Sequence, residues 1–157
     1  MAFTFQSLWD NHPSISDGEE YPCRKADGTP KYANQCSIKM GIALKKGGVD
    51  MTRFKLSTCS PTHPASECHF TWSESLAQHI RWSERKQFGN VEIKKNVKAE
   101  DYATRTGLVF FKDFWYRRGE KKYPTGDHID LWDKNKMCSG NPSYFEESKE
   151  VWFWDIA

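Results

Sequence analysis

An apolar and aromatic segment in the second half of the chain, interrupted only by Lys112 and Asp113, constrains the fold most strongly. It runs from Gly107 to Tyr116 and contains Leu108, Val109, Phe110, Phe111, Phe114 and Trp115. A strand with one solvated face alternates between apolar and polar residues, so a continuous run is typical of a strand covered on both faces. Two shorter segments of similar character follow, His128 to Trp132 and Val151 to Ile156. We expect all three segments to be strands.

The segment from Gln35 to Lys46 fits two periodicities. Its apolar residues alternate as in a strand, yet several of them also share one face of a helix. Asn34 is a suitable N-cap residue, and Gly47-Gly48 is a stop signal. Lys45 and Lys46 lie where positive charge stabilises the C-terminal end of a helix dipole. We therefore predict a buried, central helix over this segment.

Other segments complete an α+β pattern. A short helix is expected from Phe3 to Trp9, and a second one should start at a capping box formed by Thr71 and Glu74 and end near Gly89. Turn residues dominate two stretches, which we expect to be loops, residues 14–31 and 57–70. With 157 residues and no linker or repeat, the chain is interpreted as a single domain, residues 1–157.

Charge and hydropathy argue against a nucleic-acid partner, membrane insertion and a signal peptide. The formal net charge is only +2, from 23 basic and 21 acidic residues, which gives no case for nucleic acid. A basic segment at residues 117–122 beside Trp115 and Tyr116 is more typical of a solvated turn. No apolar run is long enough for membrane insertion. Residues 1–12 lack a basic region followed by an apolar one, so we expect no signal peptide.

The five cysteines leave several pairings open. If one is a catalytic thiol, four remain for disulfides, and Cys59 with Cys68 is the preferred pair because it closes a short loop. Five free thiols in a reducing compartment is the plain alternative. A zinc site on Cys59, His63, Cys68 and His69 is a further alternative, but its irregular spacing is atypical of zinc motifs. We therefore expect no metal and no cofactor.

Cys36 and His128 are the residues that suggest catalysis. Cys36 lies at the predicted helix start, where the dipole favours a thiolate, although a free cysteine is often only a small buried hydrophobe. His128 opens a predicted strand, and its imidazole can take the thiol proton and return it to a leaving amine. A third group must hold the other ring nitrogen. Asp130 shares a strand face with His128, and Asn141 is the alternative from the next segment.

Two motifs together carry a family resemblance. The segments Tyr32-x-Asn34-Gln35-Cys36-Ser37-Ile38-Lys39-Met40 and Gly126-Asp127-His128-Ile129-Asp130-Leu131-Trp132 resemble the fourth family of type VI secretion amidase effectors. The runs at 107–115 and 151–154 support the match, which extends from about Tyr21 to Trp154 in the right order.

The resemblance implies a compact papain-like fold of the NlpC/P60 kind, with the cysteine helix packed on an antiparallel sheet that carries the histidine. It implies cleavage of the D-glutamate–meso-diaminopimelate bond of peptidoglycan stem peptides, delivery by the type VI secretion machinery into the periplasm of a target bacterium, and a cognate periplasmic immunity protein. The family cysteine and histidine fall on Cys36 and His128. The family's acidic third residue has no counterpart at 137–141, so Asp130 or Asn141 takes this role.

Two other classes of function remain compatible with these residues. The same aromatic side chains, particularly Trp72, Trp115 and Trp132, suit a non-catalytic module that binds cell wall. An intracellular cysteine peptidase that acts on ordinary peptides is expected to share the Cys36–His128 site.

Overall fold

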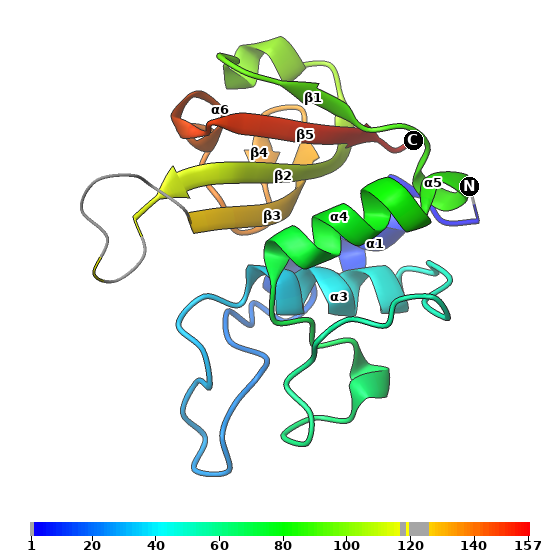
Figure 1. The fold of residues 1–157 in the computed structure, drawn as a ribbon, viewed down its shortest axis with the longest axis vertical. Helices are drawn as coiled ribbons and strands as arrows, with labels where there is room; N and C mark the ends of the chain where they lie inside the picture. Colours follow the sequence, from blue (N-terminus) through cyan, green and yellow to red (C-terminus); the bar gives the residue numbers. More distant parts are fainter. Residues whose placement is uncertain (1, 117–118, 120–125) are drawn as a thin grey trace.

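The fold is known from a computed structural model that describes residues 2–116, 119 and 126–157. Most of the basic segment that the sequence suggests as a turn, residues 117–118 and 120–122, lies outside the described residues. One sheet and a layer of three longer helices dominate the molecule, and the chain ends lie close together (Figure 1). The Phe5 amide donates to the Ala157 carbonyl over 2.8 Å, which ties the ends to each other.

The sheet has five antiparallel strands in the order β1-β5-β2-β3-β4. The strands are β1 (Glu92–Lys94), β2 (Thr106–Trp115), β3 (Gly126–Asp133), β4 (Lys136–Met137) and β5 (Glu150–Asp155). The three strands predicted from apolar runs are therefore confirmed, and they form the centre of the sheet. The two-residue β4 escapes sequence reading because so short a segment has no periodicity.

Six α-helices are present in the described part of the chain. They are α1 (Phe5–Asn11), α2 (Pro13–Ser16), α3 (Cys36–Lys46), α4 (Ser73–Ser83), α5 (Arg85–Phe88) and α6 (Tyr144–Glu147). Two 3₁₀ turns, η1 (Ala65–Glu67) and η2 (Ala99–Tyr102), complete the elements. The predicted loop at 14–31 is wrong at its start, because Pro13 occupies the first turn of α2, where its missing N–H is harmless.

Both predicted helix caps need correction. Helix α4 begins at Ser73 with Trp72 as its N-cap, so Thr71 lies outside the helix and the capping box does not form. Glu74 instead accepts a hydrogen bond from the Lys112 ammonium over 2.9 Å. The N-cap of α3 is Gln35 rather than Asn34. The predicted helix from 71 to 88 is also divided, into α4 and α5.

Two apolar layers cover the two faces of the sheet. Between the sheet and α1, α3 and α4 lie Leu8, Met40, Leu44, Ile80, Phe110, Leu131 and Trp152. The other face packs Tyr102, Val109, Phe111, Trp132, Phe145 and Phe153. Alternate residues of β2 thus enter opposite layers, as expected for a strand covered on both sides. Each fully buried side chain of this size contributes about 2 kcal/mol of hydrophobic stabilisation.

Helix α3 is the central helix of this layer, and every residue from Cys36 to Leu44 is buried. It contacts α1, α2, α4 and strand β3. Gly41 permits a close approach, because a Cβ atom there would lie 2.0 Å from the carbonyl oxygen of Cys68. Among the described residues, no helix combines the length and apolar character that a bilayer crossing requires.

Candidate active site

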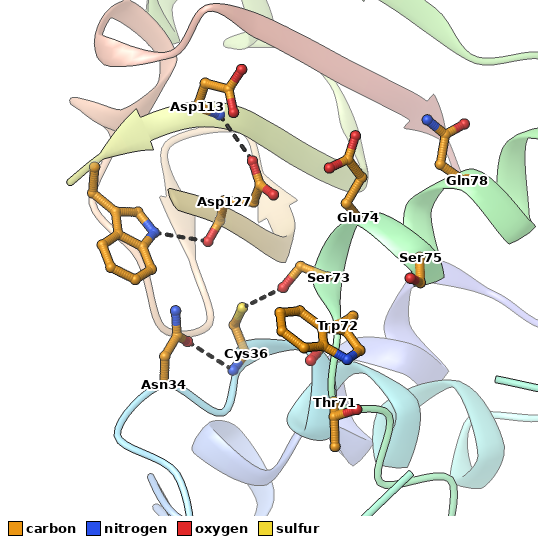
Figure 2. A pocket seen from close by; sticks show the side chains of 12 residues that line it. Asn34, Cys36, Thr71, Trp72, Ser73, Glu74, Ser75, Gln78, Asp113 and Asp127 are labelled. Carbon is orange, nitrogen blue, oxygen red and sulfur yellow. Dashed lines mark hydrogen bonds between the residues drawn. The ribbon is translucent and has the colours of Figure 1, made fainter. Parts of the chain in front are cut away.

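Two helices begin at the same point in the molecule. Cys36 is the first residue of α3, and Ser73 is the first residue of α4. The Cys36 Sγ and Ser73 Oγ atoms are 3.0 Å apart, and both point into one cavity (Figure 2). The positive ends of two helix dipoles therefore face the thiol, which favours its thiolate form.

His128 lies on β3, and α3 packs against this strand. Its imidazole is stacked on Phe111 and meets the edge of Tyr144. The Nε2 atom is 2.8 Å from Oδ2 of Asp130, which is fully buried. The Leu131 amide donates to Asp130 Oδ1, so the carboxylate is fixed on both sides. The ring orientation is thus set by packing and by one buried carboxylate.

The thiol and the imidazole interact directly, and each changes the pKa of the other. Burial raises the pKa of Cys36, but the charge and hydrogen bond of His128 and the hydrogen bond of Ser73 outweigh it, so the pKa lies below the usual thiol value. Burial lowers the pKa of His128, yet Cys36 and Asp130 raise it to about 10. Both shifts favour a thiolate–imidazolium pair, the form in which cysteine is nucleophilic.

The two residues considered as the third member have different positions. Burial raises the pKa of Asp130, but the hydrogen bond and the charge of the His128 ring outweigh this effect. The pKa of the carboxyl group therefore lies below its usual value. Asn141 is exposed, and its Oδ1 atom accepts from the Ser143 amide. The structure thus brings Asp130 into contact with His128, whereas the Asn141 side chain caps a local turn.

Three further residues at the site were not identified from the sequence. Ser73 lies between Thr71 and Glu74, the two residues of the predicted capping box, and the sequence gives it no role of its own. Ser139 donates its amide to Asp130 Oδ2 over 3.1 Å. His12 is fully buried at the α1–α2 junction, where burial lowers its pKa to about 4 despite the nearby Asp130. The only sequence signal for His12 was its place before Pro13, which marks a helix end rather than a site.

The thiol lies between two cavities that share Asn34, Cys36 and Trp115. One cavity, of about 660 Å³, has an acidic wall and is drawn in Figure 2. That wall is formed by Glu74, Asp113 and Asp127. The other cavity, of about 590 Å³, includes His128. An extended substrate can therefore lie across the thiol with one part in each cavity.

Asp113 is placed by an irregularity in β2. The pairing of β2 with β3 shifts register between Phe111 and Trp115, and Asp113 has a φ of 55° within this interval. Its amide donates to Asp127 Oδ1 over 2.9 Å (Figure 2). A bulge of this kind reorients side chains beside a site, and here it directs an acidic residue to the cavity.

The remaining thiols do not pair as predicted. All five cysteines lie in the described ranges and all are free. The expected Cys59–Cys68 disulfide is wrong, because Cys68 adopts a left-handed turn and its thiol donates to the Ser66 carbonyl. Two groups of side chains have metal-ligand character and lie close together. They are Cys23 with Cys59, His63 and His69, and His12 with Asp130 and Cys138.

Comparison with known proteins identifies the family. A family model described as type VI secretion system (T6SS) amidase effector protein 4, Tae4, matches residues 32–154, which include Cys36, Ser73, His128 and Asp130. The chain belongs to the Tae4 family. It is therefore a member of an amidase effector family of the type VI secretion system. No curated protein matches the sequence significantly.

Solved Tae4 structures share the fold over the whole chain. The Tae4 of the Enterobacter cloacae Tae4–Tai4 effector–immunity complex is 14% identical, with a TM-score of 0.65 and 100% of both chains covered. A selenomethionine variant from the Salmonella typhimurium Tae4/Tai4 system is 15% identical, with a TM-score of 0.66 and 99% of both chains covered. Tae4 of Enterobacter cloacae alone is 13% identical, with a TM-score of 0.65 and with 100% of this chain and 98% of that chain covered. At this identity the likeness establishes the α+β Tae4 fold.

Proposed function

We propose that this Tae4 family member is a cysteine amidase that hydrolyses the D-glutamate–meso-diaminopimelate bond of peptidoglycan stem peptides. The observation that carries the proposal is the chain of contacts Cys36–His128–Asp130, with a lowered thiol pKa and a raised imidazole pKa. The papain-like NlpC/P60 character is part of the same proposal, since a cysteine on a helix start opposite a histidine on a strand is the arrangement expected there.

In the first half of the reaction, the Cys36 thiolate attacks the amide carbonyl carbon and forms a tetrahedral intermediate. The His128 imidazolium then gives its proton to the departing amine, and the C–N bond breaks to leave a thioester. In the second half, neutral His128 takes a proton from water, the hydroxide attacks the thioester, and the thiolate leaves. Asp130 holds the ring throughout and stabilises its positive charge whenever the imidazolium is present.

The oxyanion is assigned two donors. The Cys36 amide donates at rest to Asn34 Oδ1 over 3.2 Å, and the oxyanion takes the place of that oxygen (Figure 2). The Ser73 hydroxyl, 3.0 Å from the sulfur, is the second donor. Two donors fixed in place before the reaction are typical of acyl-transfer sites.

The acidic cavity suggests which side of the substrate it receives. Meso-diaminopimelate carries an ammonium group beyond the amine that the reaction releases. Glu74 and Asp113 line the cavity beside the thiol, and carboxylates attract such a cation. We therefore place the diaminopimelate side of the stem peptide in this cavity and the D-glutamate side in the cavity that contains His128.

The biological setting of the proposal is an antibacterial toxin. The effector is delivered by type VI secretion into the periplasm of a target bacterium, where peptidoglycan is exposed. Tae4 relatives were solved in complex with Tai4 immunity proteins, and we propose that a cognate periplasmic immunity protein binds this chain as well. Neither nucleic acid nor membrane insertion belongs to this function.

The test is release of cleaved stem peptides from purified sacculi, followed by mass spectrometry of the products. Wild-type protein should release peptides with a new diaminopimelate amine, and Cys36→Ala should release none. Cys68→Ala is the matched control, because Cys68 is a buried free thiol away from this site. Equal activity of wild type and Cys36→Ala would end the nucleophile assignment, and binding of sacculi without cleavage would favour a cell-wall-binding module.

A further inference from the structure

Four side chains with metal-ligand character converge from two loops far apart in sequence, and two of them pack against Ile38 and Ile42 of α3. The group consists of Cys23, Cys59, His63 and His69, and one ligand atom of each lies within 4.8 Å of all the others. Three of the four side chains come from buried residues, and His63 is half-buried. The sulfur of Cys59 is 3.6 Å from Nδ1 of His69. A tetrahedral zinc ion with ordinary bond lengths separates a sulfur and a nitrogen ligand by roughly the same distance, about 3.6 Å.

One carboxylate lies beside both histidines and favours, in each ring, the tautomer that can bind a metal. The carboxylate is that of Glu67, whose Oε2 atom is 3.0 Å from His63 Nδ1 and 3.5 Å from His69 Nε2. Each ring directs one nitrogen to Glu67, so the opposite nitrogen carries the free lone pair. Metal-bound histidines commonly donate their second N–H to a carboxylate in this way.

The second ring nitrogen of His63, Nε2, faces away from Glu67 and lacks a hydrogen-bond partner in the described part of the chain. This nitrogen is also buried. A buried polar atom without a partner destabilises a fold because it has lost its hydrogen bonds to water, so such atoms are rare. A bound cation would satisfy it. Two thiols and two imidazoles form a donor set that is typical of zinc sites.

We propose a structural zinc site whose ligands are Cys23 Sγ, Cys59 Sγ, His63 Nε2 and His69 Nδ1. The two thiolates neutralise the charge of the ion, and four protein ligands leave no position open for catalysis. The site revises the sequence-based alternative, because Cys23 replaces Cys68 in the ligand set. It also revises the expectation that the protein holds no metal.

The ion would join the two segments that lead into the active site. Cys23 belongs to the loop before α3, and the Gln35 side chain bonds both the amide and the carbonyl of Cys23 over 2.8 Å. His69 belongs to the loop before α4, four residues from Ser73. The Lys31–Thr62 hydrogen bond also connects these loops. Zinc at this point therefore holds the starts of both helices in place, and with them the thiol and its serine partner.

The test uses the full-length Cys36→Ala protein, purified under reducing conditions, so that the reactive thiol cannot act as a ligand. We expect about one equivalent of zinc per chain by elemental analysis. Replacement by Co²⁺ should give the intense visible bands of a tetrahedral ion and sulfur-to-cobalt charge transfer. The readout requires no enzymatic activity, so it is independent of the proposed amidase reaction.

Variants in the same background locate the site. Cys59→Ser should abolish the tetrahedral Co²⁺ spectrum, and Glu67→Gln should weaken Co²⁺ binding roughly 10- to 100-fold. Cys68→Ser and Cys138→Ser are the matched controls and should keep the spectrum. The proposal is overturned if the reduced protein shows no tetrahedral Co²⁺ bands, if the bands survive Cys59→Ser, or if peptide mapping of the protein as isolated reveals a Cys23–Cys59 disulfide.

Discussion

The sulfur of Cys36 and the hydroxyl oxygen of Ser73 lie 3.0 Å apart, and each belongs to the first residue of its helix. The side chains of α3 and α4 pack in the same layer, so this contact is held by the core rather than by a loop. Within the proposed mechanism, the serine hydroxyl stabilises the thiolate at rest and the oxyanion during the reaction.

Removal of the Ser73 hydroxyl should therefore reduce turnover while the fold persists. We expect Ser73→Ala to lower kcat on sacculus-derived stem peptides by about 10²-fold, as loss of an oxyanion donor does elsewhere. Ser75→Ala is the control, because Ser75 lines the same cavity and has no hydroxyl contact to the sulfur in the described structure. Unchanged kcat in Ser73→Ala would exclude the hydroxyl from the oxyanion site.

Replacement of the buried carboxylate should affect catalysis through His128. Asp130→Asn removes the charge that holds and stabilises the imidazolium, and we expect kcat to fall by about 10²- to 10⁴-fold. The variant should also shift the basic limb of the pH–rate profile to lower pH, because Asp130 raises the pKa of His128. Asn141→Ala should leave both kcat and the profile unchanged; a large effect there would reinstate Asn141 as the orienting residue.

The ion pair predicts the pH dependence of thiol alkylation. Because His128 and Ser73 lower the pKa of Cys36, its reaction with iodoacetamide should reach half of its maximal rate below the usual thiol pKa. In His128→Ala only burial and Ser73 remain as the main influences, and burial raises the pKa, so the midpoint should move upward. Rates are best measured by mass spectrometry of the Cys36 peptide. Identical midpoints in the two proteins would contradict the pairing.

The close contact at Gly41 predicts a loss of stability. A Cβ atom there would lie 2.0 Å from the Cys68 carbonyl oxygen and 2.8 Å from the Phe70 ring. Backbone atoms cannot move aside as a flexible side chain can, so Gly41→Ala should destabilise the protein by about 1–3 kcal/mol or more. Thermal unfolding measures the effect. Lys46→Arg, which keeps the charge at an exposed position on the same helix, is the control and should retain the wild-type Tm.

The sequence predicted those elements whose signal is local. The apolar residues at 107–116 predicted a buried strand, and such a run occurs there because both faces of β2 are covered. The spacing of His128 and Asp130 placed both residues on one face of a strand. Spacing alone did not choose between Asp130 and Asn141. That choice depends on where β4 turns back, and a two-residue strand leaves no pattern.

Other features depend on contacts between distant segments. Ser73 has a role only because α4 begins beside α3, and the sequence around it equally suggested a capping box at Thr71. Cys23 joins the cluster of Cys59 only after the two loops meet, so the nearer Cys68 was the natural choice from spacing. Such long-range proximity is decided by packing of the whole layer, which no local pattern encodes.

The charge separation between Cys36 and His128 has a consequence for the cell that makes this protein. Neighbouring side chains of the chain itself favour the charged forms of both residues. On the proposed mechanism the thiol is therefore reactive as soon as the chain has folded. On this mechanism the producing cell is protected when the protein is kept away from the cell's own wall, or when another molecule covers the two cavities beside the Cys36 sulfur.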